Sequence, residues 1–135
     1  MAGERVVTVR WRESLLFEGG ATGRPAILVD GDSAAATSPV ELLLVAAATC
    51  TAADVVSILE KQRVALRSLA IAVQGTRREE QPRRYTAIKF QFTIAGAGAD
   101  ESKARRAIDL SLTKYCSVVA SLAPEISIAY DVAIG

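Results

Sequence analysis

The chain has 135 residues, half of them hydrophobic, and sixteen basic against fifteen acidic residues give a formal net charge of +1. This length predicts one domain over residues 1–135. The near-neutral charge argues against a nucleic-acid-binding face. Because the chain has no histidine and only two cysteines, Ser-His-Asp and Cys-His catalytic pairs are excluded, as are histidine-ligated zinc and a four-ligand structural zinc site.

The N-terminal part of the chain predicts three strands. Arg5–Trp11 is rich in β-forming residues and roughly alternates apolar with polar. Ser14–Glu18 is a second predicted strand, ended by two glycines, and Pro25–Asp30 is a third, closed by Gly31. The polar N-terminus lacks the features of a signal peptide. The longest apolar run, 42–48, is far shorter than the ~20 residues of a membrane span, so we expect a cytoplasmic protein with no membrane partner.

A long helix is predicted from Pro39 to Arg63. Ser38 precedes a proline at the first helical position and Glu41 follows at the third, which is the pattern of a capping box. Residues 42–48 are apolar on every face, so we expect this half of the helix to be buried; the second half is amphipathic and is expected to emerge from the core.

The rest of the chain predicts a hairpin, a second helix and a last strand. The hairpin strands are Leu66–Val73 and Tyr85–Ile94, joined by a charged, solvated loop, and the second of them alternates with a period of two. Asp100 is a candidate N-cap for a helix to about Lys114, and Ile126–Ile134 is the last strand. The inner stripe of that second helix is expected to contain Ala104, Ile108, Leu112 and Tyr115. The order βββ-α-ββ-α-β, with antiparallel hairpins and helices on one side, is an α+β fold.

The apolar helix also predicts oligomerisation. One small antiparallel sheet covers one side of such a helix and leaves the other sides bare. A homodimer that buries the same helix from both sides removes this problem, so we expect a homodimer.

The two cysteines are the candidate chemical groups. Cys50 lies mid-helix, and Cys116 lies at or just beyond the end of the second helix. Three roles are open for them: two small core residues, a structural disulfide, or a reactive pair in which one thiolate attacks and the other thiol resolves its sulfenic acid. A structural disulfide is disfavoured in a cytoplasmic chain. Without histidine, activation of a thiol requires an arginine, a lysine, a helix N-terminus or a hydrogen-bond donor.

Two sequence blocks resemble the OsmC/Ohr family, the osmotically inducible and organic hydroperoxide resistance proteins. Residues 39–51 (PVELLLVAAATCT), followed by DVVSIL at 54–59, look like that family's central helix, and KYCSV at 114–118 is similar to its Tyr-Cys-Pro/Ser-Val segment. The order of strands and helices agrees as well. The resemblance covers nearly the whole chain and is closest to the less-characterised OsmC-like branch.

This resemblance implies an OsmC-like fold, an intertwined homodimer and thiol peroxidase activity that reduces organic hydroperoxides to alcohols. By analogy Cys50 is the peroxidatic nucleophile and Cys116 the resolving thiol, and a dithiol reductant restores the pair. The family uses an arginine to hold the thiolate, and Arg24 is the candidate; a solvated turn arginine is the alternative. The resemblance implies no metal and no bound cofactor.

Two features bear on whether the chemistry is retained. The better-characterised branch has an active-site glutamate directly after the proline, where this chain has Val40. Glu41 is expected to be a cap, because it lies about 180° around the helix from Cys50. Asp54, one turn after Cys50, is expected to hold an arginine near the thiol. The alternative function is a non-catalytic dimeric scaffold or small-ligand-binding protein with the same fold.

Overall fold

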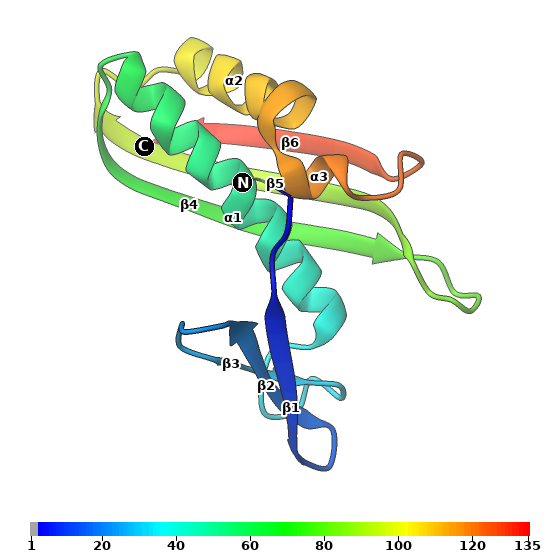
Figure 1. The fold of residues 1–135 in the computed structure, drawn as a ribbon. Helices are drawn as coiled ribbons and strands as arrows, with labels where there is room; N and C mark the ends of the chain where they lie inside the picture. The colour runs from blue at the N-terminus through cyan, green and yellow to red at the C-terminus, as the bar shows by residue number, and fades with distance from the viewer. Residues whose placement is uncertain (1–2) are drawn as a thin grey trace. The chain divides into compact units, whose positions relative to one another are not determined.

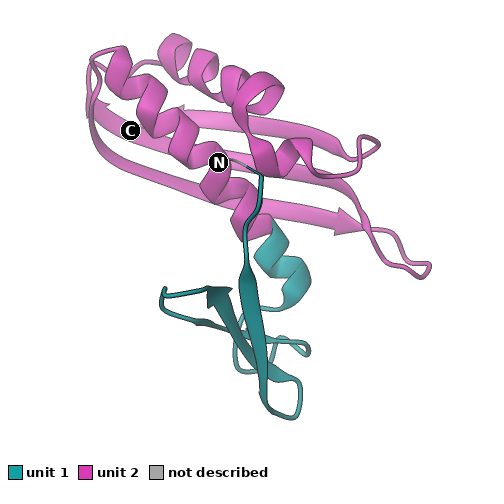
Figure 2. Ribbon diagram, in the orientation of Figure 1, with its two compact units in different colours: residues 1–43 teal, residues 44–135 magenta. Residues whose placement is uncertain are grey.

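A computed structural model describes residues 3–135, which divide into two compact units: one that ends at Leu43 and one formed by Leu44–Gly135 (Figure 2). The first unit contains β1 (Val7–Glu13), β2 (Leu16–Ala21) and β3 (Ile27–Asp30), and helix α1 (Pro39–Lys61) begins there and continues into the second unit (Figure 1). The second unit contains β4 (Ala65–Arg77), β5 (Tyr85–Ala97), α2 (Glu101–Leu110), the π-helical turn η1 (Ser111–Tyr115), α3 (Ser117–Ala120) and β6 (Ser127–Ile134). The prediction of a single domain stays a prediction.

The three predicted N-terminal strands are confirmed and form one antiparallel sheet in the order β1-β2-β3. The β1–β2 connection is tight, with Ser14 at a positive φ of 49° and a register shift between Trp11 and Glu13. The side chains of β1 are exposed along its whole length, including Val7, Val9 and Trp11.

The predicted capping box opens α1 as expected. The Ser38 backbone N–H donates to the Glu41 carboxylate over 2.9 Å, and the Glu41 N–H donates to the Ser38 hydroxyl oxygen over 3.2 Å. The Ser33 hydroxyl donates to the same carboxylate over 2.6 Å. These hydrogen bonds, that from Ser33 foremost, lower the pKa of Glu41. Glu41 therefore has a structural partner for its charge at the start of the helix.

The burial of α1 differs from the prediction. Its buried residues are Ala47, Thr51, Val55 and Leu59, a single stripe with a spacing of four that lies mostly in the second half. In the first half, Leu43 is 39% exposed and Val45 is 51% exposed. The expectation of a first half buried on every side is therefore wrong for the single chain, because a helix on one sheet can bury only the stripe that faces the sheet.

The second unit is a three-stranded sheet, in the order β4-β5-β6, with α1 and α2 on one face (Figure 1). The β4–β5 pair is the predicted antiparallel hairpin, but β6 runs parallel to β5, with Ile88 opposite Ile128. Parallel neighbours require a crossover, and α2, η1 and α3 form it, so the expectation of antiparallel hairpins throughout is wrong for the last strand. The alternation of β5 is confirmed, since its inward residues are buried: Ile88, Phe90, Phe92 and Ile94.

The second helix begins as predicted and ends differently. The Asp100 side chain caps α2 by accepting from the Lys103 N–H over 2.8 Å. The α-helix stops at Leu110, and the chain continues as the π-helical turn, so the inner face carries Ser111, which is fully buried. Tyr115 is 50% exposed and does not belong to the inner stripe. A π turn adds one residue per turn, which rotates the residues after it away from the face that the α-helical period predicts.

Candidate active site around two thiols

The structure brings Cys50 and Cys116 close enough for their side chains to interact. Cys50 is half-buried on α1, directly before the fully buried Thr51. Cys116 lies between η1 and α3 and is 3% exposed. Both are free thiols. The Cys50 side chain interacts with the Cys116 thiol and contributes to raising its pKa, so two residues distant in sequence meet in the second unit.

The Cys116 sulfur accepts two hydrogen bonds. The Thr51 hydroxyl donates to it over 3.4 Å, and the Val119 backbone N–H, at the start of α3, donates over 3.4 Å. Burial raises the pKa of the Cys116 thiol, and these two donors oppose that effect by favouring the thiolate; the neighbouring Cys50 adds to the rise, and the net direction is upward. In the reduced protein Cys116 is therefore a buried thiol with donors already in place for its thiolate.

The backbone around Cys116 is also fixed to α1. The Cys116 N–H donates to the Ser111 carbonyl oxygen over 2.8 Å, which closes the π turn. The Ser111 hydroxyl donates to the Asp54 carboxylate over 2.8 Å. Among the ion pairs of residues 3–135 none includes Asp54, so its partner is a serine hydroxyl and not the expected arginine.

Arg24 belongs to the first unit, whereas both cysteines belong to the second. It lies in the β2–β3 connection, where its N–H donates to the Ala21 carbonyl oxygen over 3.1 Å, and its side chain is exposed. With Arg10 and Glu18 it lines a hollow of about 250 Å³ on that sheet. Its role at the thiols stays a prediction.

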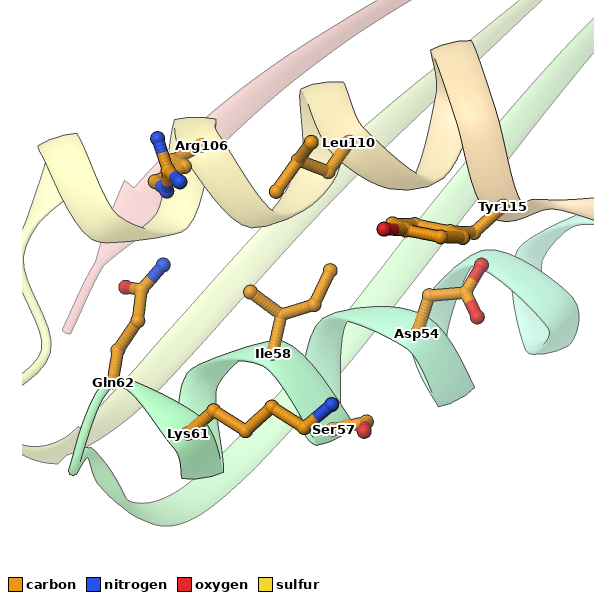
Figure 3. Close-up of a pocket in the computed structure, with 8 residues that line it drawn as sticks. All are labelled: Asp54, Ser57, Ile58, Lys61, Gln62, Arg106, Leu110 and Tyr115. Carbon is orange, nitrogen blue, oxygen red and sulfur yellow. The ribbon is translucent and has the colours of Figure 1, made fainter.

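A groove of about 390 Å³ runs between α1 and α2 in the second unit (Figure 3). At one end of the groove Asp54 and Tyr115 lie close together (Figure 3). Asp54 is one turn after Cys50, and Tyr115 is the residue before Cys116. At the other end Arg106 and Gln62 face each other (Figure 3). The remaining lining residues are Ser57, Ile58, Lys61 and Leu110.

The sequence did not single out this groove, nor Thr51 and Ser111 beside the thiols. A threonine in an amphipathic stretch is ordinarily placed on the outer face, and only the stripe of four-residue spacing through Ala47 and Val55 indicates that Thr51 points inward. Within residues 3–135 no group of three or more His, Cys, Asp or Glu side chains could hold a metal ion.

The family model described as OsmC-like protein matches residues 30–131, a span that includes α1, the π turn and both cysteines. The chain belongs to the OsmC-like family. Protein YhfA of Escherichia coli strain K12 is 40% identical over 124 residues, which cover 91% of this chain and 92% of YhfA. That name states no activity.

Solved structures of other proteins have the same fold. A hypothetical protein from Aquifex aeolicus VF5 is 27% identical with a TM-score of 0.85, and the match covers 98% of each chain. The OsmC-like protein from Mycoplasma pneumoniae is 18% identical with a TM-score of 0.84 over 99% of each chain. The predicted OsmC-like α+β fold with a long central helix is thereby confirmed.

More distant neighbours include the organic hydroperoxide resistance protein OhrB of Bacillus subtilis, 12% identical with a TM-score of 0.65 over 98% of this chain and all of OhrB. At that identity the likeness shows the fold alone.

The fold also bears on α1, which is long and apolar enough to cross a membrane by length and composition, with a mean hydropathy of 2.1 over its most apolar window. In a soluble OsmC-like protein α1 is the core helix.

Proposed function

We propose that this OsmC-like protein is a cysteine-based thiol peroxidase that reduces organic hydroperoxides to alcohols. The observation that supports the proposal best is the interaction between two free thiols of unequal exposure, Cys50 and Cys116. Unequal exposure suits a two-step cycle, since the first thiol must be accessible to the peroxide and the second must stay reduced next to it until the sulfenic acid forms.

In the first step the Cys50 thiolate attacks the terminal oxygen of the hydroperoxide. An S–O bond forms and the O–O bond breaks; the leaving alkoxide takes up a proton and departs as the alcohol, and Cys50 is left as a sulfenic acid. In the second step the Cys116 thiolate attacks the Cys50 sulfur. The S–S bond forms and the S–O bond breaks, and the leaving hydroxide takes up a proton from solvent to become water. A dithiol reductant then restores both thiols by exchange.

Arg24 is our proposed cation for the Cys50 thiolate. A guanidinium both lowers the free energy of a thiolate and donates hydrogen bonds to a peroxide oxygen. Support comes from its exposed position and from the family pattern of an arginine at the site. Arg24→Ala should slow the first step at least tenfold, Arg24→Lys should restore part of the rate, and Arg5→Ala is the control at another exposed arginine of the same unit.

We further propose that the protein is a cytoplasmic homodimer. OsmC-like proteins are typically dimeric. The exposed apolar side chains of α1 and β1 are the surface that a second copy would cover; they include Leu43, Val45, Val9 and Trp11. A reducing compartment keeps free thiols such as Cys50 and Cys116 available for the cycle.

The decisive experiment is thiol counting by mass spectrometry after treatment with tert-butyl hydroperoxide. The wild type should lose both free thiols and the mass of two hydrogen atoms. After trypsin digestion, the peptide with Cys50 and the peptide with Cys116 should be linked by a disulfide. Cys116→Ser should stop at a Cys50 sulfenic acid that dimedone traps, and Cys50→Ser should not react. A wild type that keeps both thiols under excess peroxide would refute the proposal.

A second candidate function is a dimeric scaffold or small-ligand-binding protein without peroxidase activity. Val40 in place of the glutamate of the better-characterised branch favours it, and the groove between α1 and α2 offers space for a small ligand. An unreactive Cys50, alkylated by iodoacetamide at neutral pH no faster than Cys116, would support this alternative. Rapid alkylation of Cys50 would argue against it.

A further inference from the structure

We propose that Thr51 is a positioning residue for disulfide formation: its hydroxyl holds the Cys116 sulfur beside Cys50, ready to attack the oxidised Cys50. The inference rests on the proposed peroxidase cycle and names a residue that the cycle as stated above does not require. It is carried by the hydrogen bond from the Thr51 hydroxyl to the Cys116 sulfur, which links α1 to the start of α3.

Two threonines flank Cys50, and their hydroxyls have different partners. Thr49 is exposed, and its hydroxyl donates to the Val45 carbonyl oxygen one turn back over 2.7 Å, the usual local bond of a helical threonine. Thr51 is fully buried, and its hydroxyl donates across to a sulfur. A buried hydroxyl without a hydrogen-bond partner lowers the stability of the fold. The hydrogen bond between Thr51 and Cys116 therefore restricts the positions of both the hydroxyl and the sulfur.

The sulfur and the backbone of Cys116 are thus held by the same helix. Thr51 of α1 holds the sulfur, and Asp54, one turn further along α1, holds Ser111, whose carbonyl oxygen accepts from the Cys116 N–H. Cys50 lies on the same stretch of α1. Since one rigid element carries the reacting sulfur and both anchors of its partner, the approach of the two sulfurs is set by α1, which is what an intramolecular attack requires.

The bond also has a chemical consequence in the second step. The attacking species is the Cys116 thiolate, and the donors to its sulfur, Thr51 and Val119, stabilise that form against burial. When the S–S bond forms, the Cys116 sulfur loses its negative charge. The Thr51 hydroxyl then faces a neutral disulfide sulfur, which is only a weak hydrogen-bond acceptor. Before this bond forms, the hydroxyl raises the fraction of Cys116 that is present as the thiolate and fixes the orientation of its sulfur.

The test compares Thr51→Val, which keeps the shape and removes the hydroxyl, with Thr51→Ser, which keeps the hydroxyl. Thr49→Val is the matched control, because it removes a hydroxyl from the same helix that does not touch the sulfur. In stopped-flow reactions with tert-butyl hydroperoxide, Thr51→Val should form the Cys50 sulfenic acid within twofold of the wild-type rate and close the disulfide about five- to tenfold more slowly. Thr51→Ser and Thr49→Val should close it at nearly the wild-type rate.

A second measurement needs no peroxide. In a Cys50→Ser background, the rate of Cys116 alkylation as a function of pH reports the pKa of that thiol, without the neighbouring Cys50, which is the titratable group that acts on it directly. Two charged groups on the neighbouring elements, Lys114 of η1 and Asp54 of α1, stay in place in every variant. Thr51→Val should raise the pKa of Cys116 by about half a unit to one unit, and Thr49→Val should leave it unchanged.

The outcomes separate this inference from the proposed function. Equal disulfide rates and equal Cys116 titrations in Thr51→Val and the wild type overturn the role of Thr51, whatever peroxide does to Cys50. Equal losses in Thr51→Val and Thr51→Ser also overturn it, because then packing and not the hydroxyl matters. A wild type inert to peroxide, with the titration of Thr51→Val shifted as expected, refutes the peroxidase and leaves the hydroxyl as the holder of the sulfur.

Discussion

Removal of the Ser111 hydroxyl should loosen the segment that carries Cys116. The hydroxyl is fully buried and donates over 2.8 Å to the Asp54 carboxylate, so Ser111→Ala leaves that carboxylate without its partner. A hydrogen bond to a charged group contributes about 1.5–3 kcal/mol, and because Asp54 is only half-buried we reduce this to about 1–2 kcal/mol to allow for solvent screening. For a chain of this size the midpoint of thermal unfolding should fall by about 3–8 °C.

The assay is urea unfolding at one fixed protein concentration, since association shifts apparent stability. Thr113→Ala is the matched control: Thr113 lies in the same π turn, is exposed, and donates only to the Asp109 carbonyl oxygen. It should cost less than about 0.5 kcal/mol. A double-mutant cycle of Ser111→Ala with Asp54→Ala should give a coupling of at least about 0.5 kcal/mol. If Ser111→Ala costs no more than Thr113→Ala, or if the cycle gives no coupling, the bond does not hold the segment.

The other predictions concern the helix cap, the core and the buried thiol. Ser38→Ala should cost about 0.5–2 kcal/mol by urea unfolding. The lowered pKa of Glu41 contributes stability above the pKa of the unfolded chain, and this is lost as pH falls through the folded pKa; Glu41→Gln should flatten the acid limb of the stability curve. Leu59→Ala should cost about 2–5 kcal/mol. Leu43→Ala should instead shift the sedimentation equilibrium toward monomer, and an unchanged equilibrium would count against α1 as the dimer surface. Burial raises the pKa of the Cys116 thiol above its value in the unfolded chain. The resulting contribution to the free energy of unfolding is complete below the unfolded pKa and is lost as pH rises through the folded pKa. Cys116→Ser should therefore reduce the loss of stability at alkaline pH.

Local signals in the sequence predicted most of the helices and strands and singled out the two cysteines as candidate chemical groups. The period of two in β5 and the Ser38–Glu41 capping box each reflect contacts within a few residues or one face, and the structure has both. The pairing of Cys50 with Cys116 came from the resemblance to a family and not from the pattern of residues.

Features that depend on distant parts of the chain could not be obtained in this way. Alternation along β6 indicates a strand but carries no direction, so its parallel pairing with β5 was missed. The π turn has no pattern of its own in Ser111–Tyr115, and its extra residue moved Tyr115 outward. The inward position of Thr51 was not predicted, because residue type alone does not show that its hydroxyl donates to a buried sulfur.

The parallel pairing of β6 has a consequence for how the thiol site comes into being. Cys116 lies in the connection between β5 and β6. The far end of this connection is fastened only when β6 (Ser127–Ile134) pairs with β5. Until β6 has paired, the sheet has an open edge at β5, and the connection that contains Cys116 is fastened at one end only. A chain cut before Ser127 should therefore lose cooperative unfolding and expose both thiols to alkylation at equal rates, because the position of Cys116 depends on the docking of β6.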